Sequence, residues 1–97
     1  MPAEMGNGVG QQTVGHHVEV QCFGILVQVC GASRHAVEVT ALPATVASVL
    51  ERLAEDVPAV RDHLAHTACA IGDQIVKRDA FLNAGETLVL LPPVSGG

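Results

Sequence analysis

The C-terminal segment 92–97, PPVSGG, is the part of the chain whose residue types and spacing suit chemistry most clearly. Pro92 and Pro93 each fix φ at about −65° and lack an N–H group, so they end strand pairing and hold the following residues extended. Val94 and Ser95 then form a short peptide that a partner protein can grip. The segment is therefore expected to project from the folded domain as an extended tail.

The last two residues, Gly96 and Gly97, suit a narrow active site because neither carries a Cβ. A main-chain carboxylate is a poor electrophile, so the chemistry that fits it is activation by ATP to an acyl adenylate. A nucleophile such as persulfide sulfur then displaces AMP, and glycine keeps the steric cost of that attack low. Gly97 is therefore expected to be the reacting residue.

The overall composition limits the kinds of partner. The chain has 97 residues, of which 48% are apolar, and Phe23 and Phe81 are its only aromatic residues, so Val, Leu, Ile and Ala must fill the core of one small domain. Its net charge of −5 argues against nucleic acid and anionic membranes as partners. An acidic surface of this kind fits contact with a more basic protein.

The cysteine residues favour a cytoplasmic protein without a metal site. Cys22, Cys30 and Cys69 are odd in number and form no CxxC motif, so neither a disulfide framework nor a structural metal site is expected. Cys22 and Cys69 fit small core positions, and Cys30 fits a position in or near a loop. The N-terminus lacks a signal peptide, and no apolar run reaches the ~20 residues of a membrane span. Residues 1–16, rich in glycine, are expected to form a flexible leader.

Alternation of apolar and polar residues predicts two strands, 18–22 and 36–40, joined as a hairpin with a kink at Gly24 and a turn at Gly31. After Pro43 the period becomes helical, with Thr45 placed to cap the helix and Pro58 placed to end it. Further elements follow in order: a short helical turn from 58 to 66, strands at 68–71 and 74–76 around Gly72-Asp73, and a strand at 87–91 that is a continuous apolar run after Thr87.

This order predicts an α+β fold of the ubiquitin-like β-grasp type, with a mixed sheet of four to five strands and one main helix packed on one face. The most apolar strand, 87–91, belongs in the middle of the sheet, parallel to the first strand. The domain is expected to span 17–91. Because one helix covers only one sheet face, the other is expected to bind a partner, through Leu88 and Leu90.

Three segments also carry a family resemblance: LLPPVSGG at 90–97, FLNAGETLV at 81–89 and the helix TVASVLERLAEDVPAV at 45–60. Together they resemble the small subunit of molybdopterin synthase and the other ubiquitin-like sulfur carriers of the MoaD and ThiS type, over residues 18–97. Two positions depart from the usual pattern of that family, which often has an arginine where Val27 stands and a V-N-G type hairpin in place of IGDQ at 71–74.

The resemblance implies a carrier that binds no cofactor and is not catalytic alone. A ubiquitin-activating-type adenylyltransferase, using ATP and magnesium, would activate Gly97, and a cysteine desulfurase or other sulfur donor would supply the sulfur of a thiocarboxylate. The large subunit of molybdopterin synthase would then take up the tail for dithiolene synthesis. Three alternatives remain open: a carrier for thiamine, cysteine or a specialised metabolite, a ubiquitin-like modifier that joins to lysines, and a plain interaction module.

Overall fold

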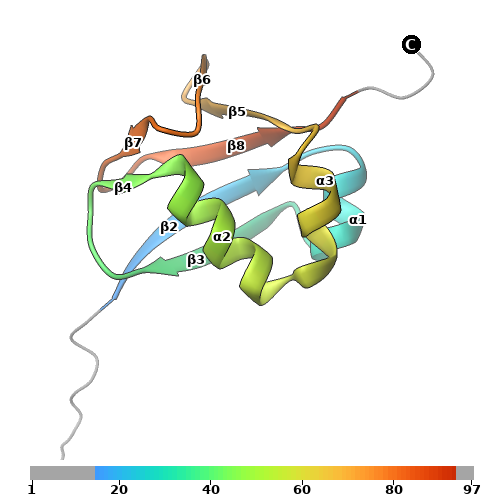
Figure 1. Cartoon of the computed structure of the whole chain (residues 1–97), viewed down its shortest axis with the longest axis horizontal. Helices are drawn as coiled ribbons and strands as arrows, with labels where there is room; N and C mark the ends of the chain where they lie inside the picture. The colour runs from blue at the N-terminus through green and yellow to red at the C-terminus, as the bar shows by residue number, and fades with distance from the viewer. Residues whose placement is uncertain (1–14, 94–97) are drawn as a thin grey trace, which may run out of the picture.

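The computed structural model describes residues 15–93, and Figure 1 shows their arrangement. A five-stranded sheet with the order β3-β2-β8-β5-β6 forms one layer, and helices cover one of its faces. A second, two-stranded sheet pairs β4 with β7. The elements are β2 (His16–Cys22), α1 (Ile25–Cys30), β3 (Arg34–Val39), β4 (Ala44–Thr45), α2 (Val46–Asp56), the 3-10 helix η2 (Pro58–Val60), α3 (Arg61–Leu64), β5 (Ala68–Ile71), β6 (Gln74–Val76), β7 (Phe81–Leu82) and β8 (Thr87–Leu91).

The topology is that of a β-grasp fold, as the order of elements predicts. Strand β8 occupies the centre of the sheet, where it runs parallel to β2 and antiparallel to β5. Strands β2 and β3 are antiparallel, as are β5 and β6. The chain therefore crosses from the first half of the sheet to the second through the helical layer, which is the connection that a parallel pair of strands requires.

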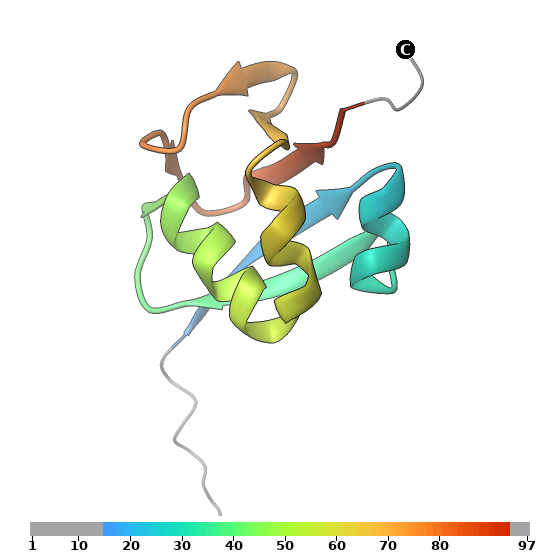
Figure 2. The same cartoon turned by 45° about the vertical axis from the view of Figure 1, so that its right-hand side comes forward.

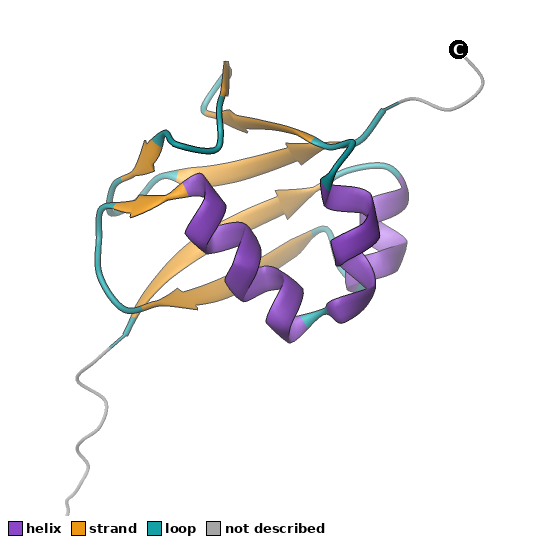
Figure 3. Ribbon diagram, viewed as in Figure 1, coloured by secondary structure: helices purple, strands orange, loops and turns teal. Residues whose placement is uncertain are grey.

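Helix α2 is the main helix and lies across the sheet in Figure 3. Thr45 caps it, since its side-chain oxygen accepts a hydrogen bond from the Ser48 N–H at 3.1 Å. The helix stops at Asp56, ahead of Pro58, as the sequence predicts. Its apolar face is buried against the sheet through Val46, Val49, Leu50, Leu53 and Ala54. No helix within residues 15–93 is long and apolar enough to span a bilayer.

The predicted hairpin between the first two strands is wrong, because helix α1 separates them. Leu26 is fully buried and anchors this helix to the core, while Gly24 and Gly31 mark its two ends with positive φ values of 59° and 82°. The Gly31 N–H closes the helix with a bond of 2.9 Å to the Val27 carbonyl. The strands themselves pair antiparallel as expected, although their limits differ and the first begins at His16, within the expected leader.

Candidate functional site

The root of the C-terminal tail lies at the end of the central strand. Strand β8 ends at Leu91, and Pro92 and Pro93 follow directly. Pro92 packs against Gly24, where a Cβ would approach the Pro92 Cγ to 3.2 Å. Figures 1 and 2 both show α1 at the same end of the sheet as the end of β8. The remaining residues predicted to form the site, Val94, Ser95, Gly96 and Gly97, lie outside the described residues.

The burial of β8 corrects one expectation about the partner-binding face. Leu88 and Leu90 are both 0% exposed and belong to the core cluster beneath the helices. They cannot contact a partner in this fold. Their neighbours point to the opposite face, where Thr87 and Val89 are partly exposed and Leu91 is 36% exposed. The outward-facing positions of the central strand are therefore Thr87, Val89 and Leu91, of which Val89 and Leu91 are apolar.

Register extends this outward face across three strands, because residues paired on neighbouring strands point to the same side of a sheet. Val89 pairs with Ala70, and Leu91 pairs with Ala68 on β5. Ala70 in turn pairs with Ile75 on β6, whose side chain is 67% exposed. We call this surface the outer apolar face; it consists of the exposed residues Ala68, Ile75 and Leu91, the partly exposed Val89, and Ala70, which faces the same side but is only 4% exposed.

The other half of the same sheet face is polar. Gln21 on β2 pairs with Val89, so it borders the outer apolar face. Beyond it, Glu19 and Arg34 form an ion pair of 2.8 Å between β2 and β3. The Arg34 side chain is 67% exposed and the Glu19 side chain 41% exposed, so solvent screens this pair and it contributes little stability. A partner docking on the apolar half would thus find charged side chains along one side, which suits the polar rim of a protein interface.

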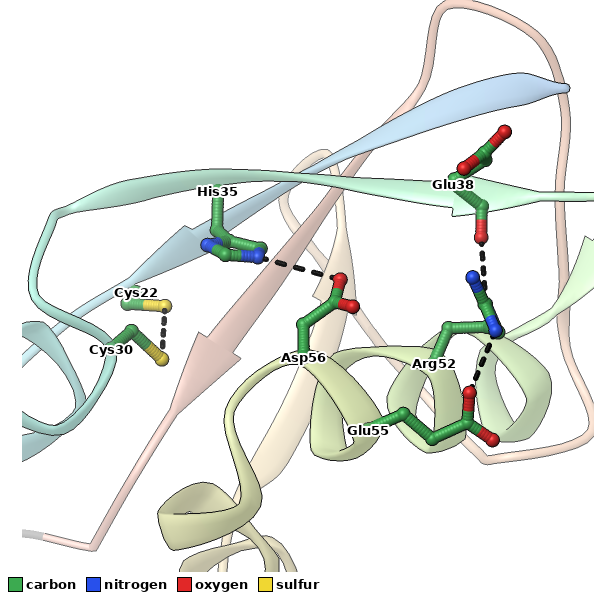
Figure 4. A network of polar contacts seen from close by, with 7 residues as sticks. All are labelled: Cys22, Cys30, His35, Glu38, Arg52, Glu55 and Asp56. Atoms are coloured by element: carbon green, nitrogen blue, oxygen red, sulfur yellow. Dashed lines mark hydrogen bonds and ion pairs between the residues drawn. The ribbon is translucent and has the colours of Figure 1, made fainter.

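Two of the polar contacts drawn in Figure 4 join helix α2 to the edge strand β3. Arg52 donates a hydrogen bond of 3.1 Å to the Glu38 carbonyl and another of 2.7 Å to Glu55. His35 lies 3.7 Å from Asp56 at the far end of the helix. Within the described range, no cluster of three or more His, Cys, Asp or Glu side chains is arranged to hold a metal ion.

The cysteines occupy the environments that the sequence predicts, with one additional contact. Cys22 and Cys69 are buried, and Cys30, the last residue of α1, is partly exposed. The Cys22 Sγ lies 3.7 Å from the Cys30 Sγ. Burial, together with the contact to Cys30, raises the pKa of the Cys22 thiol to about 12.

Arg78 has a structural role that the sequence does not reveal. Its guanidinium donates hydrogen bonds to the Leu64 carbonyl at 2.6 Å, to the Thr67 carbonyl at 3.2 Å and to the Cys69 Sγ at 2.6 Å. These contacts connect the end of α3 to the segment between β6 and β7. Arg78 therefore has an internal, structural role.

Comparisons with known proteins agree with this architecture. The model of the ThiS family matches residues 20–97. Small archaeal modifier protein 1 of Haloferax volcanii is 28% identical, with a TM-score of 0.76 over 84% of this chain and 100% of that one. No curated protein sequence matches the chain.

Two more distant structures share the fold. A putative molybdopterin converting factor subunit 1 from Pyrococcus furiosus is 21% identical, with a TM-score of 0.71 over 80% of this chain and 98% of that one. A chain of the complex of subunits 1 and 2 of molybdopterin-converting factor from Helicobacter pylori is 24% identical, with a TM-score of 0.56 over 84% of this chain and 100% of its own length.

Proposed function

The chain belongs to the ThiS family, and on this basis we propose that it carries sulfur as a thiocarboxylate on Gly97. A ubiquitin-activating-type adenylyltransferase, with ATP and magnesium, joins the Gly97 carboxylate to AMP and releases pyrophosphate. Persulfide sulfur from a cysteine desulfurase or another donor then displaces AMP. After reductive release from the donor, sulfur has replaced one carboxylate oxygen. The chain is the substrate in these steps, and its partners supply the catalytic groups.

The observation that carries this proposal is the position of β8. It is the central strand, and its end leads directly into Pro92 and Pro93. Neither proline can donate a hydrogen bond to a neighbouring strand, so sheet pairing stops there. The match to the ThiS family continues through residue 97. In this proposal the glycine-ended segment is joined to a rigid sheet through only two prolines, which lowers the entropy lost when a partner's active site positions the carboxylate.

The outer apolar face is the docking surface in this proposal. It lies on the central strand and its neighbours, so it is continuous with the root of the tail. Ile75 and Leu91 are the large apolar side chains that it exposes. An exposed apolar patch with a polar border is typical of a protein interface. A partner that covers this face can therefore hold the domain while its active site receives the tail.

The specific pathway that we propose is molybdopterin synthesis, in which the chain is the small subunit of molybdopterin synthase. The large subunit binds the loaded carrier and uses its sulfur for the dithiolene. The Helicobacter pylori complex, in which a chain of similar fold is paired with subunit 2 of molybdopterin-converting factor, supports a partner of this kind. Sulfur carriage for thiamine, cysteine or a specialised metabolite would use the same tail with a different acceptor.

A second candidate function is that of a ubiquitin-like protein modifier. The observation that favours it is the 28% identity to small archaeal modifier protein 1 of Haloferax volcanii. The Gly97 acyl group of the same adenylate would then be transferred to a lysine amine with release of AMP, giving an isopeptide bond in place of a thiocarboxylate. The two functions share the activation step and differ in the nucleophile that follows it.

Deletion of Gly97 tests the proposal. The variant ends at Gly96, which places the carboxylate about 3.5 Å short of the position reached by the full chain. Misplacement of this size lowers rates by orders of magnitude, so sulfur transfer should be lost. Binding to the adenylyltransferase, measured by calorimetry, should persist through the outer apolar face. Sulfur transfer at the normal rate by the shortened chain would refute the proposed role of Gly97.

A further inference from the structure

The thiols of Cys22 and Cys30 come together where β2 and α1 end. Cys22 is the last residue of β2 and Cys30 the last of α1, and their sulfur atoms lie 3.7 Å apart (Figure 4). The backbone is held on both sides of the pair. The Cys22 N–H donates to the Ser33 carbonyl at 2.8 Å, and Gly31 ends the helix directly after Cys30 in the left-handed conformation.

The two thiols differ in exposure, which gives them different roles toward a soluble oxidant. Cys22 is 1% exposed, whereas Cys30 is partly exposed and can meet a small molecule first. The Cys22 thiol donates its hydrogen to the Cys30 sulfur, and the raised pKa of Cys22 keeps it protonated until a reaction begins. An exposed first thiol with a buried second thiol in contact is the arrangement of an attacking and a resolving cysteine.

The third cysteine, Cys69, is kept away from this pair by the central strand. Leu90 on β8 pairs with Cys22 on one side and with Cys69 on the other. Cys22 and Cys69 are thus two strand spacings apart, about 9–10 Å, which is more than the Cα separation that a disulfide allows. The Cys69 sulfur is also engaged by the Arg78 guanidinium at 2.6 Å.

We propose that Cys22 and Cys30 form a redox-active dithiol, which a small-molecule disulfide such as oxidised glutathione converts to an intramolecular disulfide in the folded protein. The Cys30 thiolate attacks the glutathione disulfide, forms a mixed disulfide and releases one glutathione. The Cys22 thiolate then attacks the Cys30 sulfur and releases the second. The two protein thiols lose two electrons and two protons, and one glutathione disulfide becomes two glutathione molecules. A dithiol reductant reverses the reaction.

The bond would fix the segment between β2 and α1, which includes the turn at Gly24. This turn is the part of the chain that packs on Pro92. Oxidation would therefore restrain the turn at Gly24, which contacts Pro92, and does not involve Gly97. The dithiol proposal is independent of sulfur carriage, since it rests on the Cys22 and Cys30 contact alone.

The test uses the reduced full-length chain, treated with oxidised glutathione under native conditions, then acid-quenched, unfolded and alkylated. We expect one alkylated cysteine, Cys69, a mass about 2 Da lower before alkylation from the loss of two thiol hydrogens, and a peptide that links Cys22 to Cys30. The melting temperature should rise on the order of 10 °C, because the bond lowers the conformational entropy of the unfolded chain.

Two variants and one control make the result decisive. Cys69→Ala should still form the bond, whereas Cys30→Ser, a change at a partly exposed position, should not. The same oxidant applied to the urea-unfolded chain shows that the reagent can pair thiols. The proposal is overturned if the native protein keeps three free thiols under conditions that oxidise the unfolded chain. It is equally overturned if the bond maps to Cys69 or joins two molecules.

Discussion

Replacement of Leu90 by alanine, compared with replacement of its neighbour Leu91, tests which face of β8 belongs to the core. The two residues are identical in type and adjacent in the central strand, but Leu90 is 0% exposed and Leu91 is 36% exposed. Because side chains alternate along a strand, Leu90 points beneath the helices and Leu91 into the outer apolar face. Each variant is therefore the matched control for the other.

The expected magnitudes differ because only one change leaves a closed cavity. A Leu→Ala change in a core costs about 2–5 kcal/mol, since the lost burial adds to the cost of the cavity. Set against a total stability of about 5–15 kcal/mol for a domain of this size, Leu90→Ala removes a large share. A loss of about 3 kcal/mol lowers the melting temperature by roughly 12–24 °C. At Leu91 water fills the vacated space, so the cost should be about 1 kcal/mol or less.

Urea denaturation followed by circular dichroism measures both variants. We expect Leu90→Ala to shift the midpoint strongly and Leu91→Ala to shift it slightly, with the slope unchanged, so that the difference reports stability alone. Binding to the adenylyltransferase should show the reverse order, with Leu91→Ala weaker. Equal destabilisation by the two changes would refute the assignment of the faces, as would a larger effect at Leu91.

The remaining predictions concern docking, the cap of α2 and pH. Val89→Asp should weaken binding to the adenylyltransferase at least tenfold in calorimetry, because it places a charge in the outer apolar face; unchanged affinity would locate docking elsewhere. Thr45→Ala should lower the free energy of unfolding by about 1 kcal/mol in urea denaturation, because the bond to the Ser48 N–H is lost. Thr45→Ser, which keeps a side-chain hydroxyl, should retain that stability. The pKa of Cys22 is raised from 9.0 to about 12, so the folded protein keeps a proton that the unfolded chain releases. The free energy of unfolding should therefore fall as pH rises from 9 toward 12, and less steeply in Cys22→Ser.

The central strand and the main helix were predictable because each has a simple local pattern. The uninterrupted apolar run of β8 indicated a central position, and Thr45 and Pro58 marked the limits of α2. The same run concealed which residues face the core, since it shows no alternation. Strand β2 identifies the core-facing residues of β8, because Val20 and Cys22 are buried and pair with Leu88 and Leu90. The sequence therefore shows which residues of β8 face the core only when the register of its parallel pairing with β2 is known.

Helix α1 was missed because its sequence, ILVQVC, is rich in β-branched residues that favour strands. The burial of Leu26 against the core decides the conformation, which is a tertiary effect. Gly24 and Gly31, expected to be a kink and a turn, instead bound the helix. The contact between Cys22 and Cys30 depends on this helix, so it could not be predicted without it. Arg78 likewise contacts carbonyls 11 and 14 residues away, which no local pattern reveals.

Intact mass spectrometry tests the central claim, that Gly97 carries the sulfur. The full-length chain is incubated with ATP, magnesium, a cognate adenylyltransferase and a sulfur donor, with Gly97-deleted chain as the control. The mass should rise by about 16 Da, the difference between one oxygen and one sulfur, and fragmentation should place the change at Gly97, the proposed reacting residue. A mass increase that maps to Cys22, Cys30 or Cys69 instead would indicate a persulfide on a thiol and would contradict the account.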